Sequence, residues 1–421
     1  MGIAGRTSDP VVIVGAGLAG LACARRLHAD GVPVQILDAA EVIGGRVRTD
    51  VHEGFQLDRG FQVLLTAYPE AQAQLDLAAL RLHPFAPGAL VHTDGRFLRV
   101  ADPWRRPWEA LAILLTPVGT LGDALRIASL RHRCLHGTDD ALWTQPEQRT
   151  IDLLREEGFS TRIIERFFRP FFGGVLFDRE LETSSRVFHF LFRMFALGDS
   201  AVPAAGMGAI PAQLAAALPA DALQLRTRVT AVAPDGVRLQ DGAALPARAV
   251  VVATDEQTAA PWLGWPVSRA PRVCTSLYFA ADEAPAVARR SVLLNADGYG
   301  PVQNVAVVSN VAPSYAPDGQ ALISATVVGT ATTPDAELVP AVRAQLRDWF
   351  GSAVEGWRHL RSYPIAYAQP NQAPPTLPSG TRPVHALRGL YVCGDHVESG
   401  SIHGALRAGR RAAEACLADL R

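Results

Sequence analysis

The sequence predicts an α/β protein in which a Rossmann-type nucleotide-binding domain is interleaved with a second, α+β domain. Three observations support this fold. A glycine-rich turn joins an apolar strand to a helix near the N-terminus, and an apolar strand ending in Gly-Asp precedes an alanine-rich helix near the C-terminus. The length of 421 residues also exceeds what one compact core holds. The two ends of the chain are therefore expected to meet at one nucleotide site.

A βαβ unit is predicted at residues 10–38. An apolar run at 11–14 leads into the glycine-rich segment 15–20, a helix is expected to about Asp30, and a second strand covers 34–38. A strand, a glycine turn and a helix in this order, with an acid about 20 residues further on, are typical of dinucleotide-binding sites.

Each glycine of this turn has its own expected task. Gly15 permits the tight turn, Gly17 lets the backbone approach a pyrophosphate, and Gly20 lets the helix and strand pack closely. The first helical N–H groups, around Leu18 and Ala19, have no partner within the helix and are expected to face the anion.

Asp38 ends the second strand, where a carboxylate accepts hydrogen bonds from ribose hydroxyls. It would repel a 2′-phosphate, so FAD or NAD is favoured over NADP.

A second glycine pair, Gly44-Gly45, follows together with Arg46. This segment resembles the GG signature of the glutathione-reductase-like flavoproteins, in the branch that contains amine oxidases, protoporphyrinogen oxidases and phytoene (carotenoid) desaturases. The resemblance implies FAD, with the glycine pair packed on the nucleotide helix and Arg46 near the phosphates.

Two more segments resemble the same family. The loop after residue 57 looks like one that passes close to the isoalloxazine ring, which would place Gly60 and Phe61 there, although a plain turn between strands explains it equally well. The strand ending in Gly394-Asp395 resembles the closing motif, in which the aspartate binds the ribityl chain. The helix after it is implied to point its first N–H groups at the flavin pyrimidine, and the site residues expected there are Ser401, Ile402 and Ala405.

The remaining FAD contacts are expected from two central strands. The resemblance places the strand 227–232 beside the adenine, with a backbone contact at Val229, and the strand 249–254 returns the chain toward the cofactor. Ordinary core strands remain the alternative. The predicted FAD domain thus comprises 1–75, 207–265 and 381–421, and the substrate domain comprises 76–206 and 266–380. One glycine fingerprint means one dinucleotide, so electrons are expected to leave for oxygen, a quinone or an unknown acceptor.

The substrate domain is predicted as a helical cap over a mostly antiparallel sheet, the arrangement that the resemblance implies. Its first part has helical runs at 107–115 and 121–128, and its second has strand-like runs at 275–279, 304–308 and 321–328. Nine of the sixteen phenylalanines lie between Phe167 and Phe195. They are expected either to line an apolar cavity above the flavin or to fill an ordinary core.

Charge and cysteine usage restrict the partners and the location. A net charge of −1 gives no electrostatic footprint for nucleic acid. The five scattered cysteines contain no C-x-x-C pair, so neither a metal site nor a disulfide framework is predicted. With no signal peptide or spanning run, a cytoplasmic location is expected, and peripheral membrane contact through the apolar run 108–118 stays an alternative to a buried helix. The oligomeric state is not indicated.

The substrate is predicted to be a small apolar molecule of isoprenoid or porphyrinogen type, oxidised by hydride transfer to FAD. The chain contains no lysine, and Ser401 stands where amine oxidases of the family often carry a tyrosine. Both features weaken an amine oxidase producing hydrogen peroxide, which remains one alternative; a low-turnover flavin-binding redox module is another. No catalytic residue is assigned. His396 and His403 are candidates for relaying a proton, and either Tyr363 or Tyr367 is a candidate for one wall of an amine cage.

Overall fold

One six-stranded sheet gathers strands from three distant parts of the chain. Its order is β10-β2-β1-β14-β21-β20, and only the β20–β21 pair is antiparallel. The strands are β1 (Val11–Val14), β2 (Val34–Leu37), β10 (Leu223–Gln224), β14 (Ala249–Val252), β20 (His385–Leu387) and β21 (Leu390–Val392). They come from the segments predicted to build the FAD domain, whose boundaries stay a prediction. The computed structural model describes residues 9–106, 117–266, 269–287, 289–376 and 382–421.

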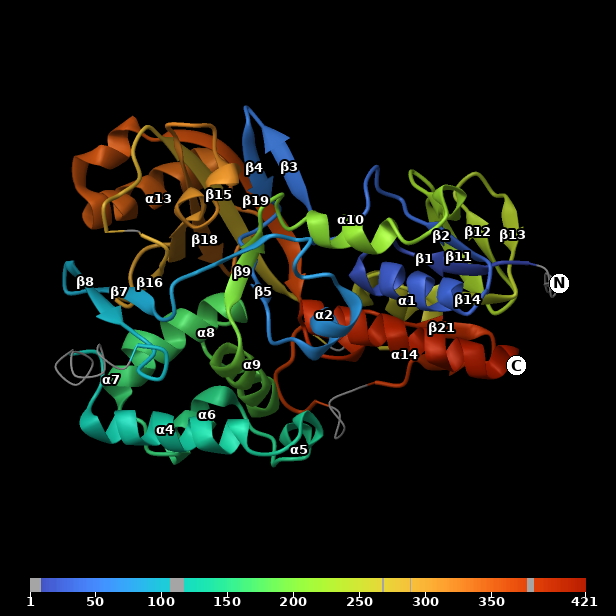
Figure 1. Ribbon diagram of the computed structural model, residues 1–421, viewed down its shortest axis with the longest axis horizontal. Coiled ribbons are helices and arrows are strands. Elements are labelled where there is room, and N and C mark those ends of the chain that lie inside the picture. Colours follow the sequence, from blue (N-terminus) through green and yellow to red (C-terminus); the bar gives the residue numbers. More distant parts are fainter. Residues whose placement is uncertain (1–8, 107–116, 267–268, 288, 377–381) are drawn as a thin grey trace.

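Both faces of this sheet are covered, which explains why its strands read as continuous apolar runs. In β1, Val11 and Ile13 pack toward α1 (Leu18–Ala29) and α14 (Ile402–Leu420), which lie side by side (Figure 1). Val12 and Val14 pack toward the other face, which is covered by an antiparallel sheet of three strands and by α11. These covering elements are β11 (Val229–Ala233), β12 (Gly236–Leu239), β13 (Ala244–Pro246) and α11 (Glu256–Leu263).

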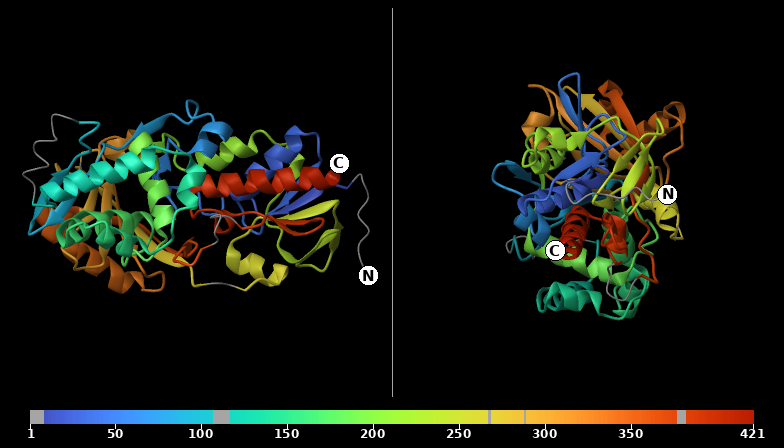
Figure 2. Two further views of the ribbon diagram at one scale, coloured as in Figure 1. Left: turned by 90° about the horizontal axis from the view of Figure 1, so that it is seen from below. Right: turned by 90° about the vertical axis from the view of Figure 1, so that its right-hand side faces the viewer.

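The second large sheet has seven strands in the order β19-β15-β18-β17-β16-β7-β8 and is antiparallel except between β16 and β7. Its strands are β7 (Ala89–Thr93), β8 (Arg96–Val100), β15 (Arg272–Ala281), β16 (Val292–Asn295), β17 (Val302–Val307), β18 (Ala321–Val328) and β19 (Arg358–Gln369). The helix α13 (Asp335–Phe350) packs on one face through Leu338, Val342 and Leu346. Figure 2 shows this sheet at the end of the elongated molecule opposite to the C-terminus.

A layer of helices lies beside this sheet at the same end of the molecule (Figure 1). It comprises α4 (Leu121–Leu135), α5 (Asp139–Trp143), α6 (Thr150–Glu156), α7 (Thr161–Ile163), α8 (Arg169–Val175) and α9 (Ser185–Leu197), with a π-helical turn at Ile164–Phe168. The two sheets and this helical layer confirm the predicted fold class. The expected helix at 107–115 lies outside the described residues, as does the apolar run 108–118 except for its last two residues. Among the helices that the structure describes, none has the length and apolarity to cross a bilayer.

One sequence-based expectation is wrong: the part 76–206 is not only helical. The strands β7 and β8 form a hairpin that extends the seven-stranded sheet. The turn residues Asp94 and Gly95 both have positive φ, at 52° and 71°, and Asp-Gly is a strong two-residue hairpin signal that favours this geometry. The pattern of long apolar runs further along the segment obscured it.

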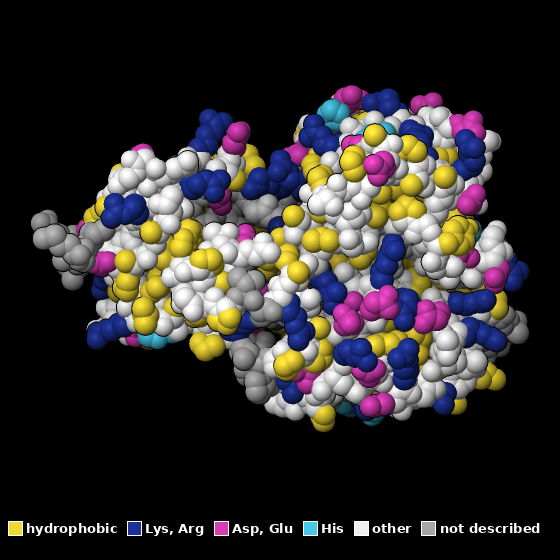
Figure 3. Space-filling view, turned by 180° about the vertical axis from the view of Figure 1, so that it is seen from behind, with side chains coloured by type: hydrophobic (Ala, Val, Ile, Leu, Met, Phe, Trp, Pro, Cys, Tyr) yellow, Lys and Arg dark blue, Asp and Glu magenta, His cyan; other side chains and the backbone are white. Residues whose placement is uncertain are grey.

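Smaller elements join the two ends of the molecule. They are β3 (Thr49–His52), β4 (Phe55–Asp58), β5 (Leu64–Leu65), α2 (Pro69–Gln74), β6 (Leu82–Pro84), β9 (Ser200–Pro203), α10 (Ala209–Ala215) and α12 (Val308–Val311). The strands β5, β9 and β6 form a small sheet, and β3 pairs with β4. On the face of the molecule seen in Figure 3, arginine and acidic side chains are interspersed, so the charges there compensate one another locally.

Candidate functional site

A large pocket of about 790 Å³ opens at the carboxyl ends of the parallel strands and continues toward the helical layer. Crevices at this edge are where doubly wound sheets bind ligands. All predicted cofactor-binding residues except Gly20 line it: Gly15, Gly17, Leu18, Ala19, Asp38, Gly44, Gly45, Arg46, Gly60, Phe61, Val229, Gly394, Asp395, Ser401, Ile402 and Ala405. The structure therefore brings together both ends of the chain.

The glycine turn is shaped as its sequence predicts. Gly15 has φ +115°, and a Cβ there would lie 2.7 Å from the carbonyl oxygen of Ala253. A Cβ on Gly20 would lie 2.0 Å from the carbonyl oxygen of Gly15, which explains why Gly20 sits in the packing and not at the pocket. The position of Gly17 is different, because the nearest atom to its Cβ would be the Gly45 Cα at 4.0 Å. Gly17 thus leaves space at the pocket, while Gly20 is required by the fold.

The second glycine pair packs directly on this turn. The Gly44 N–H donates to the Ala16 carbonyl oxygen at 2.8 Å, and Gly44 forms a bridge with Gly17. Gly44 and Gly45 have φ of +106° and +60°, which favour glycine. The two glycine segments therefore enclose a backbone-lined space beside the N-terminus of α1. The capping residue of this helix is Gly17, which has no side chain to fill the space.

Asp38 is held at the edge of this space by two backbone donors. One carboxylate oxygen accepts from the Ala16 N–H at 2.7 Å, and the other accepts from the Ala40 N–H at 2.7 Å. These bonds orient the side chain, and each oxygen keeps a further lone pair for another donor.

Arg46, which directly follows the second glycine pair, forms an ion pair with Asp395 at the pocket. The two terminal guanidinium nitrogens donate to the two carboxylate oxygens at 2.8 and 2.6 Å, and one of them also donates to the Ala368 carbonyl oxygen. Burial opposes the charged guanidinium, but the Asp395 carboxylate outweighs it and raises the pKa of Arg46. The guanidinium also lies 5.0 Å from the centre of the Tyr367 ring. Two ends of the chain are thus tied together at the pocket.

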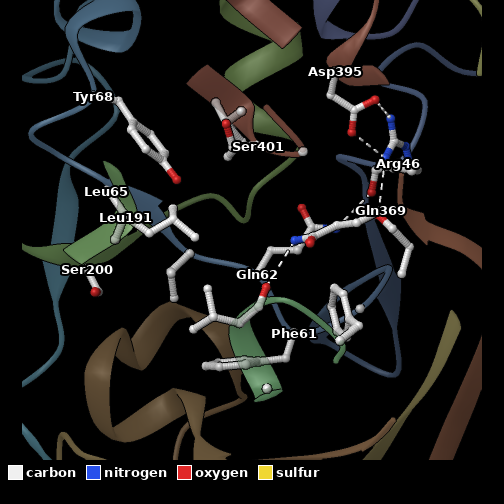
Figure 4. A pocket seen from close by; sticks show the side chains of 18 of the residues that line it. Arg46, Phe61, Gln62, Leu65, Tyr68, Leu191, Ser200, Gln369, Asp395 and Ser401 are labelled. Atoms are coloured by element: carbon white, nitrogen blue, oxygen red, sulfur yellow. Dashed lines mark hydrogen bonds and ion pairs between the residues drawn. The ribbon is translucent and has the colours of Figure 1, made fainter. Parts of the chain in front are cut away.

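The loop with Gly60 and Phe61 forms the next section of the wall. Gly60 has φ +101°, and a Cβ there would lie 2.7 Å from the terminal carbon of Ile365. The Gln62 amide donates to the Arg46 carbonyl oxygen at 2.9 Å and so fixes the loop to the arginine segment. Figure 4 shows Gln62 and Phe61 facing the middle of the pocket, with the Arg46–Asp395 pair to one side.

The start of α14 closes the pocket on its other edge. Ser401 caps the helix, accepting from the Gly404 N–H at 3.0 Å, and Ile402 and Ala405 line the pocket. Tyr68 lies close to Ser401 (Figure 4) and stacks on Phe190 at 6.1 Å between ring centres. Burial raises the pKa of the Tyr68 phenol strongly, against a smaller opposite effect of its hydrogen bond with Ser401. The phenol is therefore a neutral donor at this edge.

Beyond the flavin-type motifs the pocket is walled by phenylalanines. Of the nine between 167 and 195, those that line it are Phe167, Phe171, Phe172, Phe177, Phe192 and Phe195. The others, Phe168, Phe188 and Phe190, are buried in the surrounding core. Both interpretations of this cluster thus hold for different members: most face the pocket, and the rest support them.

At its outer end the pocket is bordered by Trp104, Arg105 and Arg131. Arg105 is paired with Asp199 at 2.6 Å, and Arg131 lies under the Trp104 indole, 4.8 Å from its ring centre. This end of the pocket therefore carries basic groups, in contrast to the phenylalanine wall.

The three weak catalytic candidates do not line the pocket. The Tyr363 hydroxyl donates to Asp50 at 2.8 Å, whereas Tyr367, four residues further along the same strand, lines the pocket. His396 and His403 are buried; burial lowers the pKa of His396 and lowers that of His403 to about 4. Both rings are neutral near pH 7 and lie away from the pocket, so the structure offers no support for a proton relay through them.

Several lining residues were not found from the sequence. Tyr68 follows no motif and is brought to the pocket by its position before α2, while Arg131 is one of many arginines on a helix. Gln62 was part of the loop motif but carried no assigned role. The signal that was available for Tyr68 is the Tyr-Pro step that begins a helix directly after the ring-side loop.

The doubly wound sheet and the glycine-lined pocket at its carboxyl edge are those of a dinucleotide-binding protein. The model of the family of flavin-containing amine oxidoreductases matches residues 18–417, and the chain belongs to this family. It is an FAD-dependent oxidoreductase, as predicted. The chain is 25% identical over 173 residues to protoporphyrinogen oxidase 2 of Arabidopsis thaliana, and 38% identical over 109 residues to phytoene dehydrogenase of Streptomyces griseus. These matches cover 39% and 22% of this chain, and 32% and 21% of the relatives.

The fold is shared over nearly the whole length with solved structures. Cyclohexylamine oxidase from Brevibacterium oxydans superimposes with a TM-score of 0.72 at 18% identity, covering 98% of this chain and 99% of the other. Since the curated relatives are matched over no more than about a third of their own length, their activities are not transferred to this chain by similarity alone.

Proposed function

We propose that the pocket holds FAD in an extended conformation, with the pyrophosphate between the two glycine segments. This placement fits the residues present. Space without side chains lies between Gly17 and Gly45, free N–H groups of α1 face it, and Asp38 stands at its edge. A site for a neutral ligand would not need the N-terminus of α1, whose unpaired N–H groups favour an anion.

The other predicted residues have matching tasks in this proposal. Val229 lies with the adenine end, the Arg46–Asp395 pair with the middle of the cofactor, and Gly60 with the ring end, where a side chain would collide with Ile365. Ser401 and Ile402 bring the first N–H groups of α14 toward the ring. When bound, the flavin supplies the acceptor for two electrons and a proton from the substrate.

We further propose that the substrate is an apolar molecule of isoprenoid or porphyrinogen type. The observation that carries this is the phenylalanine wall, which continues from the ring end of the pocket toward the helical layer. Phe171 and Phe195 make an edge-to-face contact at 5.1 Å, so the wall is preorganised and not a loose collection of rings. Burying an apolar substrate there contributes about 25 cal/mol per Å² of apolar surface and excludes water from the reacting carbon.

The chain's own residues do little acid–base chemistry in this proposal. The described lining offers no lysine and no histidine, and the tyrosines Tyr68 and Tyr367 both have pKa values raised by burial. A hydride leaving an apolar carbon needs a substrate held in place more than it needs a protein base. The proton released after the hydride is expected to leave through water at the open end of the pocket.

Anaerobic reduction of the bound flavin tests this proposal. The FAD-loaded protein would be mixed with phytoene, with protoporphyrinogen and with a panel of primary amines and polyamines, and the loss of flavin absorbance followed. Bleaching by an isoprenoid or a porphyrinogen and not by amines is the expected outcome. Bleaching by amines alone would contradict the substrate class and leave the cofactor assignment untouched.

Amine oxidation stays the second candidate because two tyrosines, Tyr68 and Tyr367, line the pocket. Neither occupies the position of Ser401, but two aromatic rings from other segments offer the surfaces that an amine needs. Hydrogen peroxide formed from an amine in air, abolished together in Tyr68→Leu and Tyr367→Leu, would favour this candidate.

A further inference from the structure

The outer end of the pocket contains an arginine that is held by a backbone carbonyl and an aromatic ring. Arg131 lies on α4, and its guanidinium donates to the Ala196 carbonyl oxygen at 3.3 Å from each terminal nitrogen. Above it lies the indole of Trp104. Within the described part of the chain, Arg131 takes part in no ion pair, although it lines the pocket. One backbone carbonyl and one aromatic face engage only part of its N–H donors, and no carboxylate among the described residues pairs with its charge.

The neighbouring arginine shows the contrast. Arg105 also lines the pocket, but it donates to Asp199 and to the Gly198 carbonyl oxygen, both at 2.6 Å. Asp102 lies 3.8 Å from the same guanidinium. Among the residues that the structure describes, Asp102 and Asp199 both contact Arg105 and neither is paired with Arg131, so neither carboxylate directly compensates the Arg131 guanidinium.

The position of Arg131 at the end of the phenylalanine wall indicates a ligand with an apolar body and a polar end group. Phe195 lines the pocket one residue before Ala196, whose carbonyl holds Arg131, and Ile127 lines it one helical turn before Arg131 on α4. A ligand lying along the phenylalanines thus reaches the guanidinium with its end. Trp104, which is 46% exposed, covers the guanidinium and shields it partly from water.

We propose that Arg131 is a subsite for the carboxylate of an amphipathic substrate whose apolar part lies along the phenylalanine wall. This inference rests on the proposed function and narrows it to substrates that carry a carboxylate on an apolar body, as porphyrinogens do and isoprenoid hydrocarbons do not. A guanidinium matches a carboxylate with two parallel N–H donors, and stacking under an indole holds its plane. A substrate with a hydroxyl or methyl at the same end would leave the cation unpaired. Arg131 acts in binding and orientation and touches no reacting atom.

Binding of two matched probes to the FAD-loaded protein tests the subsite. Farnesoic acid and farnesol share one isoprenoid chain and differ only in the end group, and calorimetry gives a Kd for each. The wild type is expected to bind the acid about tenfold more tightly at low ionic strength, since hydrogen bonds to charged groups are the stronger kind. The preference should decrease as salt is added. In Arg131→Gln the acid should lose its advantage, while the Kd of farnesol stays unchanged.

The helix α4 provides a matched control two positions away. Arg133 is exposed, pairs with Glu157 and does not line the pocket, so Arg133→Gln should keep the preference for the acid. Equal affinity of the wild type for both probes, or an unchanged preference in Arg131→Gln, would overturn the subsite while farnesol binding still supports the apolar pocket. If neither probe bound, the proposed function would fail, and the subsite with it. If Arg131→Gln does not fold, the wild type alone tests the subsite. A preference for the acid that decreases as salt is added supports the subsite, and a preference that salt does not change overturns it.

Discussion

Arg46 and Asp395 lie 349 residues apart in the chain and form a two-fold charged hydrogen bond at the pocket. Arg46 follows the second glycine pair, and Asp395 ends the strand that precedes α14. Because Asp395 is only 4% exposed, the negative charge of its carboxylate is compensated by the Arg46 guanidinium and not by water. The pair therefore joins the folding of the two ends of the chain to the formation of the cofactor site.

Replacing Arg46 by methionine should remove flavin and destabilise the protein. The variant leaves Asp395 buried without a cation, which costs roughly 2 kcal/mol once the partial exposure of Arg46 is allowed for. Thermal unfolding and the ratio of flavin to protein absorbance measure the two effects. Arg226→Met is the control, because Arg226 and Glu41 are each 75% exposed in their ion pair, and such pairs contribute little. A flavin content in Arg46→Met equal to that of the wild type would contradict the role of the pair.

Substitutions at Gly17 and Gly20 are predicted to have different effects, one on flavin binding and the other on stability. A valine at Gly17 projects into open space at the pocket, and the backbone there has φ −75°, which any residue adopts. Gly17→Val should therefore fold with near wild-type stability as a colourless apoprotein. An alanine at Gly20 places its Cβ 2.0 Å from a backbone oxygen, so Gly20→Ala should lose about 3 kcal/mol or fail to accumulate. Circular dichroism and flavin content on both variants separate the cases; yellow, stable Gly17→Val would refute the pyrophosphate placement.

The nucleotide end of the molecule was predictable because its chemistry is local. Gly15, Gly44 and Gly60 need positive φ or close approach, and each stands within a few residues of the element it serves. The burial of the parallel strands on both faces also follows from their continuous apolar runs. Motifs of this kind identify residues through backbone constraints that only glycine meets.

The substrate end was less predictable because its contacts are between distant segments. Tyr68, Phe195 and Arg131 line one pocket, yet nothing in their own sequence neighbourhoods marks them. The placement of His403 shows the reverse: it lies one residue from Ile402 in the motif but points into the packing beside Tyr68. Helical position decides which of two neighbours faces the site, and a motif alone does not fix it.

Substitutions in the phenylalanine cluster should separate residues that line the pocket from residues that only pack in the core. Phe168 is completely buried and does not line the pocket, so Phe168→Ala should cost about 3 to 5 kcal/mol of stability. Phe195 lines the pocket and is partly accessible, so Phe195→Ala should cost about 1 kcal/mol and weaken farnesol binding several-fold. Denaturant unfolding and calorimetry test both variants. Equal stability losses with no change in farnesol binding would show that the cluster is core throughout.

Asp58 is expected to make the folded protein less stable as the pH rises, which is the opposite of the usual effect of a carboxyl group. It is a buried carboxyl at the end of β4, where it accepts from the Met207 N–H at 2.9 Å and the Tyr315 hydroxyl at 2.8 Å. Burial raises its pKa to about 6, and hydrogen bonds from Thr49 and its other donors offset only part of that effect.

In the unfolded chain an aspartate titrates near 3.9, so between about pH 4 and pH 6 the folded protein binds more protons than the unfolded one. The stability contributed by Asp58 is therefore complete below about pH 4 and is lost as the pH rises through 6. The unfolding free energy of the wild type minus that of Asp58→Asn should fall by about 2 kcal/mol between pH 4.5 and pH 7.5. Urea unfolding of both proteins at several pH values measures this difference. A difference that stays constant, or grows with pH, would mean that Asp58 is ionised in the folded protein throughout this range.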